Sequence, residues 1–201
     1  MAVLVISCSP RKNGNTELLL EHCLKGLADA NVDGKFVRLQ EFHIEPCREC
    51  LSCHITGKCV INDDMQGFYP QLITTQGLII GSPIFFMGIP AKGKAFIDRC
   101  QPFWAKKYLI KEKSFEKKHR IGGFLSLGGT TFSYLFDGAV RTIKSFFKVI
   151  DIDYKEELLI KGIDQKGEIL EHPEILELSH KLGFRIGEAV KKEEKNERDF
   201  W

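Results

Sequence analysis

Short apolar runs alternate along the chain with longer segments in which apolar residues repeat at helical spacing. The first run, Ala2–Ser7, is rich in β-branched residues, as expected of a strand buried on both faces of a parallel sheet. Comparable runs predict further strands at Lys35–Leu39, Gly77–Gly81, Arg120–Leu127 and Asp153–Ile160. Helices are expected between them and after the last, over residues 15–27, 65–75, 90–104, 135–150 and 173–192. This alternation predicts an α/β fold with a doubly wound parallel sheet.

Three of the expected helices contain residues that indicate where a helix begins or is interrupted. Asn15 is a suitable N-cap for the first helix, and Pro90 suits the first position of the third. Pro70 is expected to interrupt or kink the second helix, because proline lacks the N–H that a helix interior needs.

Length and composition are those of a globular chain. We expect one domain over residues 1–201, with a cysteine-rich segment at 42–64 and a C-terminal helix and tail at 173–201. The net charge is only +2, so a surface for nucleic acid would have to be local, and none is expected. No apolar run reaches the ~18–20 residues that span a bilayer. The N-terminus lacks a basic leader, and a cytoplasmic protein without membrane partners is expected.

The loop after the first strand is dense in hydrogen-bond donors. It lies between a buried strand and a helix N-terminus, where unpaired N–H groups and the helix dipole favour an anion. It lacks the Gly-Lys-Ser/Thr ending of a nucleotide-binding loop, and the chain has no G-x-G-x-x-G. The composition suits a phosphate monoester such as that of FMN, although an ordinary polar connection has similar residues. The candidate phosphate-binding residues are Ser9, Arg11, Asn13, Gly14, Asn15 and Thr16.

The loops after the third and fourth strands fit the same ligand, because the carboxyl ends of parallel strands meet at one edge of a sheet. The third loop is unusually apolar and offers a wall for a flat isoalloxazine, unless its aromatic residues simply cap the core. A glycine pair in the fourth loop lets backbone approach a ligand, or makes only a turn. The candidate residues are Ser82, Pro83, Ile84, Phe85, Phe86, Gly128 and Gly129.

Four of the seven cysteines lie within thirteen residues, as Cys47-x2-Cys50-x2-Cys53-x5-Cys59. Three thiolates spaced three residues apart can wrap one face of a compact inorganic core, and the fourth closes it after a turn at Gly57. Four thiolates are what a 4Fe–4S cluster requires. Zinc sites more often pair two separated C-x2-C hairpins, so the spacing favours the cluster over zinc or free redox-reactive thiols.

The other three cysteines are interpreted as structural. Cys23 falls on the apolar face of the first helix, and Cys100 follows an apolar stretch. Cys8 borders the phosphate loop, where a helix N-terminus can lower a thiol pKa, but an inert role is favoured. No histidine forms a convincing catalytic pair, so no catalytic residue is assigned. His54, inside the cysteine segment, could contact the surroundings of a cluster, but a solvent-facing role is favoured.

A basic segment runs from Lys106 to Arg120. It could dock an acidic electron carrier or a nicotinamide phosphate, since basic patches steer anionic partners. The favoured interpretation is a solvated extension whose Trp104, Tyr108 and Phe115 pack at a subunit interface.

Several motifs together resemble the flavodoxin-like NADPH-dependent FMN reductase family over residues 1 to about 150. They are Ser9-Pro10-Arg11 with Asn15-Thr16, Ser82–Phe86 and Pro90–Arg99. The resemblance implies strand order 2-1-3-4-5, with the cysteine segment inserted after the second strand, and non-covalent FMN. The chain departs from the family at Cys8, commonly glycine, and at Phe85, frequently tyrosine.

The cysteine motif before Asp63-Asp64-Met65 is similar to that of the iron–sulfur flavoproteins of anaerobic archaea and bacteria. This resemblance implies that Cys47, Cys50, Cys53 and Cys59 are the cluster ligands. It also implies a homodimer or homotetramer in which one subunit's cluster faces a neighbour's FMN.

A cluster passes single electrons, whereas FMN holds one or two. The expected function is therefore an oxidoreductase that takes electrons from a carrier such as ferredoxin and delivers them to an acceptor. Two alternatives are an NAD(P)H-dependent FMN or quinone reductase without a cluster, and a zinc-stabilised flavin-binding sensor or interaction module.

Overall fold

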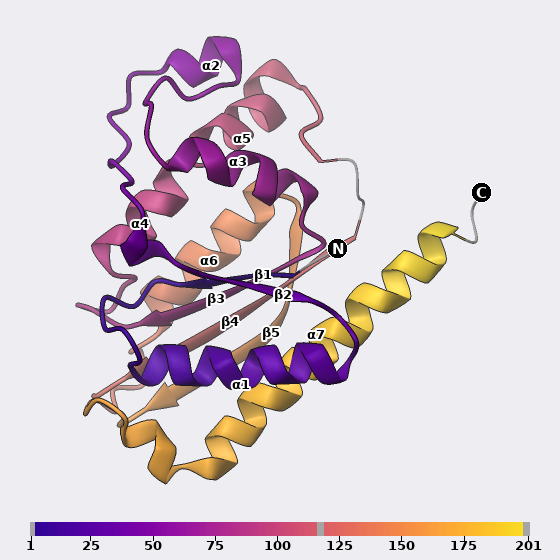
Figure 1. The fold of residues 1–201 in the computed structure, drawn as a ribbon. Helices are drawn as coiled ribbons and strands as arrows, with labels where there is room; N and C mark the ends of the chain where they lie inside the picture. Colours follow the sequence, from indigo (N-terminus) through magenta and orange to yellow (C-terminus); the bar gives the residue numbers. More distant parts are fainter. Residues whose placement is uncertain (1–2, 116–118, 199–201) are drawn as a thin grey trace.

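The computed structural model describes residues 3–115 and 119–198. The predicted strand residue Ala2, the basic residues Lys117 and Lys118, and the last three residues of the expected domain lie outside this range. Five parallel strands form one sheet: β1 (Val3–Ser7), β2 (Gly34–Arg38), β3 (Gly77–Pro83), β4 (Arg120–Gly128) and β5 (Ile152–Lys161). Their order, β2-β1-β3-β4-β5, confirms the predicted flavodoxin-like topology (Figure 1).

Helices cover both faces of the sheet (Figure 1). On one face lie α1 (Asn15–Asp29) and α7 (Pro173–Arg198), and on the other α3 (Met65–Thr74), α4 (Ala91–Asp98) and α6 (Asp137–Val149). Shorter helices are η1 (Leu39–Glu41), α2 (Ser52–Thr56), α5 (Gln101–Ala105), η2 (Lys106–Ile110) and η3 (Glu168–Glu171). Within residues 3–115 and 119–198, every helix is too short or too polar to cross a membrane.

The apolar run of β1 contributes side chains to two separate hydrophobic cores, because successive side chains of a strand point to opposite faces of the sheet. Val3 and Val5 pack with α1 and α7, while Leu4 and Ile6 pack with α3, α4 and α6. The chain turns from one face to the other between β1 and β3, which is the switch point where ligands bind in such sheets. The loops after β1, β3 and β4 meet there.

Three local expectations were wrong. The predicted helix at 90–104 divides into α4 and α5 at Arg99 and Cys100, because Pro102 cannot donate a helical hydrogen bond to Asp98. The helix α3 continues through Pro70, so the expected interruption is wrong, and Phe68 and Leu72 are buried on either side of the proline. The N-cap of α1 is Gly14 rather than Asn15, whose side chain is engaged elsewhere.

Candidate functional site

The loop after β1 is shaped by its own side chains. The Ser9 hydroxyl accepts the Arg11 N–H at 3.1 Å, and the Glu17 carboxylate accepts the Asn13 N–H at 2.8 Å. Asn13 has the left-handed φ of 54° that this turn requires. Because Gly14 caps α1 without a side chain, no cap competes for the first-turn N–H groups. These groups and the helix dipole make the loop fit for an anion.

Asn15 and Arg11 tie this loop to the segment after β5. The Asn15 amide donates to the Gln165 carbonyl at 2.7 Å and accepts the Gly167 N–H at 2.8 Å. Arg11 Nη1 donates to the Asp164 carbonyl at 2.9 Å. The segment 162–168 was not predicted as part of the site. Its signal in the sequence is a polar turn between Gly162 and Gly167 at the carboxyl end of the last strand.

The structure brings most of the predicted flavin-binding residues around one small cavity. The cavity is about 60 Å³, the space of about two water molecules. Four predicted residues do not line it: Asn13, Gly14, Ser82 and the fully exposed Phe86. The predicted residues that do line it are Ser9, Arg11, Asn15, Thr16, Pro83, Ile84, Phe85, Gly128 and Gly129.

Gly129 faces protein rather than open space at this cavity. A Cβ added to it would lie 2.8 Å from the Asp164 side chain, so glycine lets the segment after β5 close against β4. Asp164 thereby becomes part of the cavity wall.

The loop after β3 contains a strained tight turn. Phe85 and Gly88 exchange two backbone hydrogen bonds of 3.0 Å around Phe86 and Met87, which have φ of 47° and 62°. This is the geometry of a type I′ turn, whose central positions normally hold Asn and Gly. Bulky residues pay strain there, and strain of this kind clusters at functional sites. The turn projects the Phe86 ring into solvent at the ligand-binding edge.

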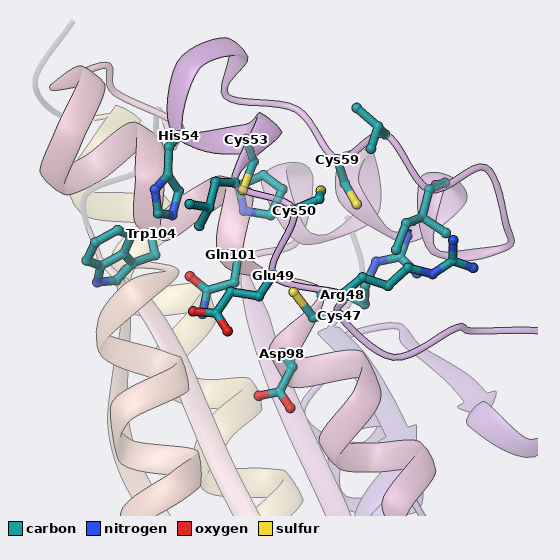
Figure 2. A pocket seen from close by; sticks show the side chains of 15 residues that line it. Cys47, Arg48, Glu49, Cys50, Cys53, His54, Cys59, Asp98, Gln101 and Trp104 are labelled. Atoms are coloured by element: carbon teal, nitrogen blue, oxygen red, sulfur yellow. Dashed lines mark hydrogen bonds between the residues drawn. The ribbon is translucent and has the colours of Figure 1, made fainter.

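The cysteine segment forms a second, larger cavity. It measures about 470 Å³ and is lined by all four motif cysteines and by residues of α4 and α5, among them Asp98 and Gln101 (Figure 2). Cys47 and Cys50 are exposed, and Cys53 and Cys59 are half-buried. His54, predicted to face solvent, instead packs against Trp104 with ring centres 5.6 Å apart at one end of the cavity (Figure 2).

Left-handed backbone lets the segment coil around this cavity. Glu49 and Leu51 have φ of 51° and 62°, and Gly57 has φ of 66°. A Cβ at Gly57 would lie 2.7 Å from the Lys106 side chain, so the helix α2 packs closely on η2. The αL position at Leu51 starts α2 directly after the second cysteine, which aims Cys53 at the same cavity.

The four thiols share one electrostatic environment. Hydrogen bonds from the backbone and side chain of Ser52 lower the pKa of Cys50. Burial raises the pKa of Cys53, and so does repulsion from the thiolates of Cys59, Cys47 and Cys50. A cationic group bound among them would relieve this repulsion.

Four thiolates can bind either a zinc ion or a 4Fe–4S cluster, and the two centres differ in size. A tetrahedral zinc ion holds four sulfurs about 3.8 Å apart, from Zn–S bonds of about 2.3 Å. In a 4Fe–4S cluster each thiolate binds a different iron, so the sulfurs stand further apart around a larger core. The four cysteines that line one cavity of about 470 Å³ provide the donor set and the space for a cluster.

A buried ion pair closes the cysteine segment. Arg99 donates to both oxygens of Asp63, at 2.6 and 2.9 Å, and the side chains are 0% and 1% exposed. Burial alone would raise the pKa of Asp63, but the hydrogen bonds and charge of Arg99, with the Glu45 N–H, hold it below its ordinary value. The pair is protected from solvent screening.

The basic segment after α5 is partly neutralised. Lys106 pairs with Glu112 at 3.4 Å, and Lys107 pairs with Asp151. Phe115, predicted at a subunit interface, is buried in the chain's own core with its ring 5.1 Å from that of Phe103. The prediction for Phe115 was wrong because its ring packs against Phe103 and the Arg120 guanidinium within the same chain.

The three remaining cysteines are buried, as predicted. Burial raises the pKa of Cys8 and Cys23 to about 12, and it raises the pKa of Cys100 as well. Neutral thiols at these positions are poor nucleophiles and poor metal ligands.

Known proteins resemble this chain in sequence and in fold. The model of the NADPH-dependent FMN reductase family matches residues 1–142. An iron-sulfur flavoprotein of Methanocaldococcus jannaschii is 29% identical over 198 residues, covering 95% of this chain and 98% of the relative. A second from the same organism is 30% identical over 149 residues, covering 73% and 71%. The solved NAD(P)H:quinone oxidoreductase from Methanothermobacter marburgensis has the same fold, with a TM-score of 0.68 and 17% identity over 92% of this chain and 96% of that one.

Proposed function

The chain belongs to the iron-sulfur flavoproteins of the NADPH-dependent FMN reductase family, and we propose that it passes electrons between a one-electron carrier and an acceptor through a 4Fe–4S cluster and FMN. That it is an FMN-dependent oxidoreductase follows from the family. The observation that carries the finer proposal is the single cavity lined by Cys47, Cys50, Cys53 and Cys59.

Bound FMN accepts one or two electrons, so it connects single-electron carriers to two-electron chemistry. In this chain, Ser9, Thr16 and the first turn of α1 would bind its phosphate, with Arg11 supplying positive charge. The cavity of about 60 Å³ accommodates a group of phosphate size, so the ring must rest on the neighbouring exposed loops. Phe85 and Phe86 offer the apolar surface for it.

The four cysteines would hold the cluster, which passes electrons singly. Ser52 favours the Cys50 thiolate that a ligand must present, and α2 directs Cys53 inward. Trp104 and His54 form one end of the cavity. No residue needs to move a proton for this electron transfer.

The two cavities have no lining residue in common. Electron transfer needs the cofactors close together, so we propose a homodimer or homotetramer in which each cluster faces a neighbour's FMN. A ferredoxin-like carrier is the proposed donor. The seven cysteines are all free, which suits the reducing cytoplasm.

Anaerobic purification with FMN, iron and acid-labile sulfide counted per chain tests this function. About one FMN, four iron and four sulfide are expected. Cys50→Ser should lose iron and retain FMN, whereas Cys23→Ala, outside the motif, should retain both. Protein that contains zinc and no iron would support the alternative of a zinc-stabilised flavin-binding sensor or interaction module. Metal-free protein whose flavin is bleached by NADPH would support the cluster-free reductase.

A further inference from the structure

Arg99 is a fully buried arginine at the end of α4 that joins both ends of the cysteine segment. Besides its two bonds to Asp63, it donates to the Glu45 carbonyl at 2.9 Å and the Ile61 carbonyl at 3.2 Å. Glu45 precedes the first motif cysteine, and Ile61 and Asp63 follow the last. One side chain therefore fastens the entry and the exit of the segment.

The guanidinium has a fifth N–H donor, which none of these hydrogen bonds uses. Arg99 Nε is buried and has no hydrogen-bond partner in the described part of the chain. Arg99 and Cys59 both line the cysteine cavity. Burial alone would lower the pKa of Arg99, but the side chains of Asp63, Tyr69 and Cys59 raise it. The Tyr69 hydroxyl donates to the Arg99 carbonyl at 2.8 Å. A buried donor without a partner is costly, so its retention in the wall of this cavity needs a reason.

We propose that Arg99 is a positioning residue for the cluster: it fixes both ends of the cysteine segment and presents a buried positive charge and an unpartnered N–H to the cavity that the cysteines line, which raises the cluster's reduction potential. This inference rests on the proposed function. It assigns Asp63 the opposing role, because its carboxylate partly cancels the Arg99 charge at the cavity.

The sign of the effect follows from charge. One-electron reduction adds a negative charge to the cluster, and a nearby buried cation stabilises the reduced form. Hydrogen bonds to cluster sulfurs act in the same direction. Removing Arg99 should therefore lower the potential, and neutralising Asp63 should raise it. A clamp that merely held the loop in place would loosen in both variants and move the potential the same way.

The test is an EPR-monitored redox titration of the full-length holoprotein, with iron content measured on each sample. R99Q should shift the one-electron equilibrium roughly tenfold toward the oxidised cluster, equivalent to about 59 mV. D63N should shift it in the opposite direction. R99K, which keeps the charge but loses the two-point contact, should shift it by less than half as much as R99Q. The control K94Q removes an exposed charge from the same helix and should leave the potential in place.

Shifts of the same sign in R99Q and D63N would overturn the inference. If R99Q does not fold, the other two variants decide. A raised reduction potential in D63N together with a nearly unchanged potential in R99K supports the inference. An unchanged or lowered potential in D63N overturns the inference. A wild-type protein without iron would instead overturn the proposed function itself, before any variant is compared.

Discussion

The side chain of Asn15 accepts the backbone N–H of Gly167 at 2.8 Å, joining the first turn of α1 to the segment after β5. The same amide donates to Gln165 at 2.7 Å. The segment is stiffened from the other side by Glu168, whose carboxylate accepts the N–H groups of Asp164 and Gln165. The wall of the phosphate-sized cavity thus depends on contacts between residues about 150 positions apart.

Removing this tie should weaken FMN binding. Asn15→Ala loses three hydrogen bonds, to Gln165, Gly167 and Ile169. Each is worth about 0.5–1.5 kcal/mol, so FMN affinity should fall by about tenfold or more. Asn15→Asp keeps an acceptor but places a negative charge beside the phosphate, and its affinity should fall further. The quenching of FMN fluorescence by apoprotein measures the FMN affinity of both variants. Wild-type affinity in Asn15→Asp would show that the phosphate binds elsewhere.

Arg11 should act on the phosphate and not on the ring. Its side chain is exposed and reaches the Asp164 carbonyl at 2.9 Å beside the cavity. A hydrogen bond to a charged group contributes about 1.5–3 kcal/mol, so Arg11→Met should weaken FMN binding roughly ten- to a hundredfold. Riboflavin, which has no phosphate, is the control and should bind wild type and variant equally. An equal loss for both ligands would contradict this role.

The cysteines should divide into two classes on alkylation. In reduced protein without metal, iodoacetamide at about pH 8 should modify Cys47, Cys50, Cys53 and Cys59. Cys50 should react faster than Cys53, because Ser52 lowers the pKa of Cys50 while burial and neighbouring thiolates raise that of Cys53. Peptide mass spectrometry against time measures the order.

The buried thiols are the internal control of that experiment. Cys8 and Cys23 have pKa values raised to about 12, and Cys100 is fully buried too, so all three should react only after unfolding in denaturant. Modification of Cys8 in the folded protein at the rate of the motif cysteines would refute the inert role.

Two glycines should respond oppositely to alanine. Gly183 lies where α7 crosses α1, and a Cβ there would be 2.0 Å from the Cys23 carbonyl. Gly183→Ala must push the helices apart and should lower the free energy of unfolding by about 1–3 kcal/mol. Gly67, in α3, has open space around it, so Gly67→Ala should raise that free energy by up to about 1 kcal/mol. Urea denaturation measures both, and a neutral Gly183→Ala would mean that the crossing is loosely packed.

The strands β1, β3 and β4 were predictable because each is a largely apolar run next to turn-forming residues. The predicted Arg120–Leu127 and observed Arg120–Gly128 differ by one residue. The helix α2 was not predicted, because its start depends on the left-handed conformation of Leu51, which propensity does not indicate. The break at Arg99 was missed because apolar periodicity continues across it to Phe103 and Trp104.

The residues around the phosphate-sized cavity were predictable because the topology of the sheet brings them together. Ser9, Phe85 and Gly129 follow different strands, and a parallel sheet brings their loops to one edge. The role of Arg99 was not accessible in this way. In the sequence it is a charged residue after a helix, and its burial depends on Glu45 and Asp63, which lie 54 and 36 positions away. The same holds for Asp164 against Arg11 and for Gln165 against Asn15.

The clamp at Arg99 has a consequence for how such chains diversify. Since the two ends of the cysteine segment meet at one guanidinium, the chain enters and leaves the segment at the same place. A loop whose ends are held together loses little more chain entropy when it is lengthened, so an insertion beside the exposed Ile55 should leave the sheet beneath unchanged.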